Sequence, residues 1–186
     1  MTTHSSRRLV LSTLVSLNGV ISEPLAWAGP YFGPGSAAAS LAALRGCSAM
    51  LMGRRTYDIF SRQWPDTPGD YAAHLNAMPK YVFSSTLRDP HWTNTTVLDT
   101  EVAGTVAAMK REPGGDLIVY GHGRFGHTLA AAGLVDELAV TVVPVTVPGG
   151  ASFSHPGDAP SSWEVLSAGP GADPGLVSLR YRPRRG

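Results

Sequence analysis

The sequence is poor in the features on which many specialised proteins depend. Cys47 is its one cysteine, so no disulfide can form within the chain, and a disulfide-stapled secreted scaffold is disfavoured. It stands before the apolar run 49–52, and we interpret it as a small buried hydrophobe rather than a reactive thiol. No run approaches the roughly 18 apolar residues of a membrane-spanning helix. The formal net charge is only +1 at pH 7, so electrostatics predict neither nucleic acid nor a membrane surface as a partner.

Targeting and metal-binding patterns are missing as well. An apolar run at 9–15 follows Arg7 and Arg8, but Asn18-Gly19 interrupts it and no small-residue cleavage site follows. We therefore expect a cytoplasmic protein. The six histidines do not fall at the spacings of zinc ligands, so no metal site is expected.

What is present is the composition of an ordinary globular domain. Hydrophobic residues make up 43% of the 186 residues and charged residues 16%. Single domains commonly contain roughly 100–200 residues. We therefore expect residues 1–186 to form one domain, whose core needs neither metal nor disulfide.

Short apolar runs alternate with helical spacings along most of the chain. Val102, Val106 and Met109, for example, fall on one face of a helix, whereas the run 9–15 is short and β-rich, as in a buried strand. The expected strands are 9–15, 47–52, 80–84, 96–98, 116–120 and 136–145. The expected helices are 36–44 with Ser36 as its cap, one that follows Gly53 and carries Tyr57, 70–76, 102–109 and 125–132.

Toward its end the chain predicts strands with no helices between them. These strands are 163–166 and 176–181, and the second alternates apolar with polar residues, as half-exposed strands do. The order of elements predicts an α/β fold with a mostly parallel sheet, flanking helices and antiparallel C-terminal strands. Ligands of such sheets bind at the carboxyl ends of the parallel strands.

The segment 23–35 is predicted to be a long loop, because it holds three prolines and three glycines. It also carries Trp27, Tyr31 and Phe32. These aromatic side chains favour a loop that covers a substrate and excludes water. Packing of the loop against the core is the alternative, and the sequence leaves both open.

Three short elements with phosphate-binding chemistry follow expected strands. The first runs from Gly53 through Arg54 and Arg55 to Thr56, where a glycine permits close approach and the arginines supply charge. The second is the hydroxyl run 84–86, and the third is the strand–glycine–helix step 121–125.

Each element alone has a plainer explanation. A glycine after a strand is commonly a bare turn, paired arginines are commonly a solvated helix start, and 84–86 is typical of a capped turn. We do not interpret the third element as a Rossmann fingerprint. The occurrence of all three elements at strand ends favours phosphate binding.

The chain resembles the dihydrofolate-reductase-like proteins, and most closely the reductase domain of the bacterial bifunctional riboflavin-pathway deaminase-reductase. The matching segments span almost the whole chain and are specific for the superfamily, although not for a substrate. They are 16–20, 51–57, 78–84, 119–123 and 132–138, with Pro144-Val145.

The resemblance implies that NADPH is the cofactor and that the chain forms a homodimer. It also implies a structural role for Asp136 and Glu137 at the start of a strand. The cofactor-binding residues are expected to be Gly53, Arg54, Arg55, Thr56, Ser84, Ser85, Thr86, Gly121, His122, Gly123, Arg124 and Phe125. The cations and hydroxyls at 54–55 and 84–86 fit the 2′-phosphate of NADPH, and no acidic residue that follows the second or third strand is expected within reach of them.

The residues that would supply a proton are not evident. Dihydrofolate reductases place a carboxylate on the helix after the first loop, and 36–44 contains no acid. Asn18 stands where the family usually has aspartate, and we expect it beside the substrate together with Trp27, Tyr31 and Phe32. Asn18, Glu23 and Asp58 are the weak catalytic candidates.

We therefore expect an NADPH-dependent reductase that transfers a hydride to a small heterocyclic or carbonyl substrate. The alternative is a nucleotide- or drug-binding protein that keeps the fold without the chemistry.

Overall fold

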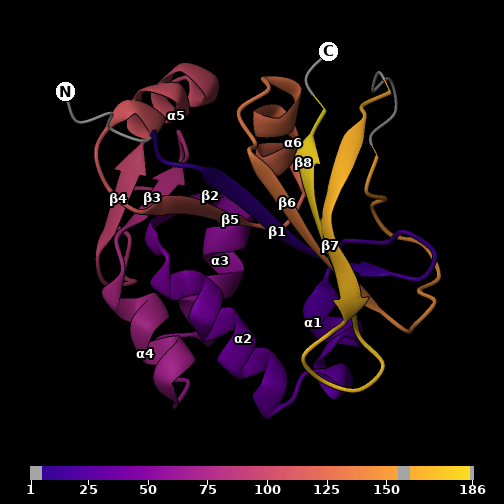
Figure 1. Ribbon diagram of the computed structural model, residues 1–186. Coiled ribbons are helices and arrows are strands. Elements are labelled where there is room, and N and C mark those ends of the chain that lie inside the picture. Colours follow the sequence, from indigo (N-terminus) through magenta and orange to yellow (C-terminus); the bar gives the residue numbers. More distant parts are fainter. Residues whose placement is uncertain (1–5, 155–159, 185–186) are drawn as a thin grey trace.

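A computed structural model describes residues 6–154 and 160–184, and its centre is an eight-stranded sheet (Figure 1). The strand order is β4-β3-β2-β5-β1-β6-β8-β7. The strands are β1 (Leu9–Ser16), β2 (Cys47–Gly53), β3 (Lys80–Phe83), β4 (Thr95–Leu98), β5 (Asp116–Tyr120), β6 (Glu137–Val143), β7 (Trp163–Pro170) and β8 (Val177–Pro183).

The first six strands are parallel, and the last two run against their neighbours. β8 pairs antiparallel with β6, and β7 pairs antiparallel with β8. This is the α/β arrangement that the order of the elements predicts. The helices are α1 (Pro24–Trp27), α2 (Pro34–Arg45), α3 (Arg54–Gln63), α4 (Asp70–Ala77), α5 (Val102–Arg111) and α6 (Arg124–Ala131), with a short 3-10 helix at Gly29–Tyr31.

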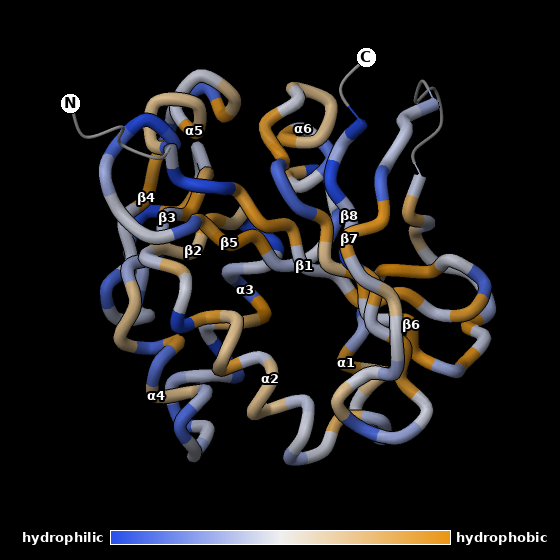
Figure 2. Tube along the Cα trace, in the orientation of Figure 1, coloured by the Kyte–Doolittle hydropathy of each residue, from blue (hydrophilic) through white to orange (hydrophobic). Residues whose placement is uncertain are grey.

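Helices cover both faces of the sheet, α5 and α6 on one face and α2, α3 and α4 on the other (Figure 1). Side chains on β2 alternate accordingly: Ala49 and Leu51 pack on the α5–α6 side, and Met50 and Met52 on the α2–α4 side. The strands β5 and β1 are strongly hydrophobic (Figure 2). Burial on both faces explains why these strands are nearly continuous apolar runs in the sequence.

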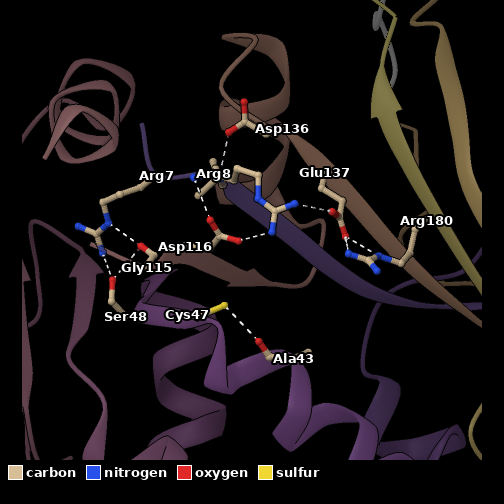
Figure 3. A network of polar contacts seen from close by, with 11 residues as sticks. Arg7, Arg8, Ala43, Cys47, Ser48, Gly115, Asp116, Asp136, Glu137 and Arg180 are labelled. Carbon is tan, nitrogen blue, oxygen red and sulfur yellow. Dashed lines mark hydrogen bonds and ion pairs between the residues drawn. The ribbon is translucent and has the colours of Figure 1, made fainter. Parts of the chain in front are cut away.

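A polar network joins the amino ends of the parallel strands (Figure 3). Glu137 is 3% exposed and its carboxylate accepts hydrogen bonds from Arg8 and Arg180, the latter at 2.6 Å. Asp136 accepts from the backbone N–H of Leu9 at 2.8 Å. The two acids hold β1, β6 and β8 together, so they are structural, as the resemblance implies.

Cys47 lies beside this network and is half-buried. Its Sγ is 3.5 Å from the carbonyl oxygen of Ala43 (Figure 3), and burial raises the pKa of its thiol to about 11. The thiol is therefore protonated at neutral pH, and the interpretation of Cys47 as a packing residue agrees with its surroundings.

The segment 23–35 differs from the expected loop, because it contains α1 and the 3-10 helix. The helix after it begins at Pro34, and Ser36 is not its cap. Instead, the carboxylate of Asp173, in the turn between β7 and β8, accepts hydrogen bonds from the backbone N–H groups of Gly33, Gly35 and Ser36 at 2.7, 3.1 and 2.7 Å. These bonds lower the pKa of Asp173, with the Ser36 side chain as the leading contributor. The cap thus comes from a residue far along the chain.

None of the helices in the described ranges is both long and apolar enough to span a membrane.

Candidate functional site

The three phosphate-type elements meet at the carboxyl edge of the sheet. They follow β3, β2 and β5, and these strands are consecutive neighbours in the sheet order. All three are parallel, so the elements that follow them leave the sheet at the same edge. The sheet therefore brings together the residues 53–56, 84–86 and 121–125.

No side chain caps the first turn of α3. Gly53 occupies the N-cap position and provides no side-chain hydrogen bond to the helix. A Cβ at Gly53 would lie 3.2 Å from Cβ of Phe125, whose ring in turn packs on Phe83 with centroids 5.1 Å apart. The ends of β2 and β3 thus contact the start of α6. Phe125 is a packing residue that holds the elements at their spacing.

The third element extends one residue beyond its expected boundary. Gly121, Gly123 and Gly126 have the full G-x-G-x-x-G spacing, which the expected boundary at residue 125 left incomplete. Gly121 has φ 84°, which a tight turn requires, and a Cβ at Gly123 would meet nothing within 4 Å. A Cβ at Gly126 would lie 2.7 Å from the carbonyl oxygen of Gly121, so Gly126 permits close packing of α6 on the strand end. These are the three roles that glycines have in dinucleotide-binding turns, here on a sheet with a different strand order.

Two of the three arginines at this edge are paired with carboxylates. Nε of Arg54 lies 2.7 Å from Oδ1 of Asp58, and Nη2 of Arg55 lies 3.3 Å from Oε1 of Glu23. Asp58 follows β2, so the expectation that no acid after the second or third strand reaches this cluster was wrong. Within residues 6–154 and 160–184, no acid pairs with the exposed Arg124.

The hydroxyl run 84–86 forms a compact turn. Oγ of Ser84 accepts hydrogen bonds from the backbone N–H groups of Thr86 and Leu87 at 3.2 and 3.1 Å. Ser85 and Thr86 remain exposed. Ser84 therefore shapes the turn, and the other two residues present donors to solvent.

The His122 side chain is buried rather than directed to solvent. Its ring stacks on Phe153 with centroids 4.5 Å and planes 12° apart. The backbone of His122 lies in the glycine turn, whereas its imidazole packs on Phe153.

The amide of Asn18 makes three hydrogen bonds within the chain. Its Oδ1 accepts from Ser16 Oγ and from the backbone N–H of Val147, and its Nδ2 donates to the carbonyl oxygen of Val147 at 2.9 Å. Aspartate could not make this last bond, because a carboxylate has no donor. Asn18 thus links the residues that follow β1 to those that follow β6, through two hydrogen bonds with the backbone of Val147. This link explains why asparagine stands where the family usually has aspartate.

The three aromatic residues of the segment 23–35 have different surroundings. Trp27 and Tyr31 pack against a small core cluster with Val143 and Leu176, and Trp27 donates its indole N–H to the carbonyl oxygen of Ser22 at 2.9 Å. Phe32 is 38% exposed. Of the two explanations left open by the sequence, packing holds for Trp27 and Tyr31.

The hollow in the protein surface lies outside the predicted site. This hollow of about 400 Å³ is lined by Val135, Trp163 and Pro183 among others, at the amino edge and away from every predicted site residue. In the described part of the chain, no three histidine, cysteine, aspartate or glutamate side chains gather as metal ligands.

Comparison with known proteins defines the fold class. A protein assigned to riboflavin biosynthesis from Shewanella sp. PV-4 has a TM-score of 0.77 at 19% identity, over 96% of this chain and 99% of that one. A pyrimidine reductase-like protein from Corynebacterium diphtheriae has a TM-score of 0.69 at 15% identity, over 100% and 95% of the two chains. Dihydrofolate reductase from Enterococcus faecalis, complexed with NADP(H) and RAB-propyl, has a TM-score of 0.63 at 16% identity, over 96% and 97%. The chain therefore has the dihydrofolate-reductase-like fold, a reductase-type fold.

The sequence then places the chain within that class. The model of the RibD C-terminal domain matches residues 7–167, and the chain belongs to this family. The uncharacterized protein YyaP of Bacillus subtilis (strain 168) is 27% identical over 103 residues. The match spans 54% of that relative, about half its length, and 53% of this chain.

Proposed function

We propose that this protein is an NADPH-dependent reductase that transfers a hydride to a small heterocyclic or carbonyl substrate. The observation that carries the proposal is the Gly121–Gly126 turn, where the strand end, the open Gly123 and the N-terminus of α6 fit a pyrophosphate. NADPH, when bound, supplies the hydride. The chain's own residues would hold its phosphates at α6 and α3, with Arg54 and Arg55 as cations.

Cofactor choice tests this assignment directly. Each charge-assisted hydrogen bond to the 2′-phosphate is worth roughly 1.5–3 kcal/mol, so even one gives at least about tenfold preference for NADPH over NADH. Arg55→Ala is expected to weaken NADPH binding by about tenfold or more, and NADH binding less if Arg55 contacts the 2′-phosphate. Titration calorimetry at low salt measures both, and equal affinity of the wild-type protein for the two cofactors would refute the assignment.

Gly123→Val tests the glycine turn separately. Gly123 has an extended backbone, with φ −70° and ψ −169°, which valine can adopt. The substitution should abolish binding of NADPH and of NADH without changing the melting temperature.

Hydride transfer to a substrate is a separate question from cofactor binding. We propose a panel of pteridines, pyrimidines and quinones, with loss of NADPH fluorescence as the readout. Dihydrofolate itself is expected to turn over negligibly, well below about 1 per second, because α2 contains no acid.

The weak catalytic candidates are all engaged within the chain. Glu23 and Asp58 are ion-paired with arginines, and Asn18 is hydrogen-bonded to Val147. These pairings favour a second candidate, a nucleotide- or drug-binding protein without catalysis, which would bind NADPH and oxidise none of it.

A homodimer is the assembly we propose, through the outer strand β7. Within the described residues β7 has no neighbour on its outer side, and Val165 and Leu166 on it are 57% and 45% exposed. Val177 on β8 adds an exposed apolar side chain, at 41%. Unpaired strand edges with apolar side chains are ready to pair with another chain. Light scattering at micromolar concentration is expected to give a dimer mass, and Leu166→Glu to give a monomer; a wild-type monomer would contradict the proposal.

A further inference from the structure

One ion pair fastens the α1 segment, residues 23–28, to the candidate cofactor site. Oε1 of Glu23 lies 3.3 Å from Nη2 of Arg55, and Arg55 is in the first turn of α3. Glu23 follows β1, whereas α3 follows β2, and β5 lies between these two strands in the sheet. The pair therefore joins segments on either side of the strand that carries the glycine turn.

Another anion can replace Glu23 in this ion pair at little cost in free energy. Glu23 and Arg55 side chains are 72% and 75% exposed, so water solvates both charges and the pair stabilises the fold only weakly. Glu23 also has a left-handed backbone conformation, φ 51° and ψ 48°, which is unfavourable for a residue with a side chain. The other end of the segment is fixed in the core, because Ala28 is 2% exposed and Trp27 packs against the same cluster. The ion pair of Glu23 with Arg55 thus holds the start of the segment against α3.

We propose that Glu23 occupies the position of a cofactor phosphate on Arg55, and that phosphate binding releases Glu23 and loosens the start of α1. This inference rests on the proposed function. A carboxylate and a phosphate both satisfy a guanidinium, and only one of them can hold the same N–H groups. Arrival of the cofactor is thereby coupled to loosening of the start of α1, while Ala28 and Trp27 stay packed in the core.

The test compares NADPH affinity in charge-matched variants. Glu23→Gln removes the competing anion and should tighten NADPH binding by about two- to fivefold. In an Arg55→Met background the same substitution should have no effect. Glu164→Gln is the matched control, because Glu164 is 47% exposed and pairs with Arg182 on the β7–β8 hairpin; it should leave the affinity unchanged. In about 1 M sodium chloride, where the screening length is near 3 Å, the gain should vanish.

Hydrogen exchange reports the release itself. The amides of Ala26 and Ala28 donate to the carbonyl oxygens of Glu23 and Pro24 and should exchange faster when NADPH is added to the wild-type protein. In Glu23→Gln they should exchange fast without NADPH. Slower exchange on NADPH addition, or equal affinity of Glu23→Gln and wild type, would overturn this inference alone. Failure of both proteins to bind NADPH would overturn the proposed function instead.

Discussion

Replacement of Lys80 by methionine is expected to lower the free energy of unfolding by about 2–4 kcal/mol. Lys80 begins β3 and is 1% exposed. Its Nζ donates to the carbonyl oxygens of Leu75, Asn76 and Met78 at 2.9, 2.9 and 2.7 Å, and lies 4.5 Å from the ring centroid of Trp92. Methionine keeps the length of the side chain but leaves carbonyl groups at the end of α4 without this donor, and unpaired buried acceptors are costly.

Urea denaturation at neutral pH measures this loss. Lys110→Met is the comparison variant: Nζ of Lys110 donates to one carbonyl oxygen, that of Leu134 at 2.7 Å, and pairs with the carboxylate of Asp136 at 2.5 Å. These side chains are more exposed than Lys80, at 14% and 25%. We expect Lys110→Met to lose less stability than Lys80→Met. A loss below about 1 kcal/mol for Lys80→Met would show that the three carbonyl contacts do not stabilise the protein.

The same lysine predicts a pH dependence of stability. Burial lowers the pKa of Lys80 from 10.5 to about 8, although its carbonyl acceptors favour the ammonium form. Between these two values the unfolded chain binds a proton that the folded chain has released, so stability contributed by this group rises with pH. The difference in unfolding free energy between wild type and Lys80→Met should therefore be larger near pH 10 than at pH 7. A flat difference across this range would contradict a lowered pKa.

Gly126→Ala is expected to cost about 3 kcal/mol of stability and to disturb the candidate cofactor turn. Its Cβ would lie 2.7 Å from the Gly121 carbonyl oxygen and 3.0 Å from Cδ1 of Leu11, and the nearer atom belongs to the backbone. Backbone cannot move aside as a flexible side chain does. Either α6 shifts away from β5 or the Gly121 turn changes shape.

Gly123→Ala is the matched control for this substitution. Gly123 is in the same turn, and a Cβ there would meet nothing within 4 Å. Thermal or urea denaturation should give nearly wild-type stability for Gly123→Ala and a clear loss for Gly126→Ala. Equal stability of the two variants would mean that Gly126 is not needed for helix–strand packing.

Local pattern was enough to predict most of the elements and to place the three candidate phosphate-binding segments directly after strands. Period-two alternation and helical spacing depend on neighbours in the sequence, so the strands and helices from β2 to β6 lie within a few residues of their expected bounds. The glycine turn was also visible, but its boundary was set one residue short. Complete spacing through Gly126 would have identified the packing role of that glycine.

Local pattern could not predict which distant side chains meet. The cap of α2 comes from Asp173, 140 residues beyond Gly33 in the sequence, and the segment 23–35 takes its shape partly from that bond. Glu23 and Asp58 were candidates for proton transfer, and only their pairing with Arg55 and Arg54 showed where their charges act. Sequence spacing carries no information about such contacts, because they depend on how separate elements pack.

The sequence by itself determined that this chain forms an α/β sheet with glycine-rich turns after its strands, since those features need only local periodicity and backbone freedom. The tertiary structure decided that β3, β2 and β5 are neighbours, and therefore that the three turns lie side by side along the carboxyl edge of the sheet. Strand order is set by how each crossover helix packs on the sheet, and parallel strands that are distant in the sequence become adjacent only once those helices are placed.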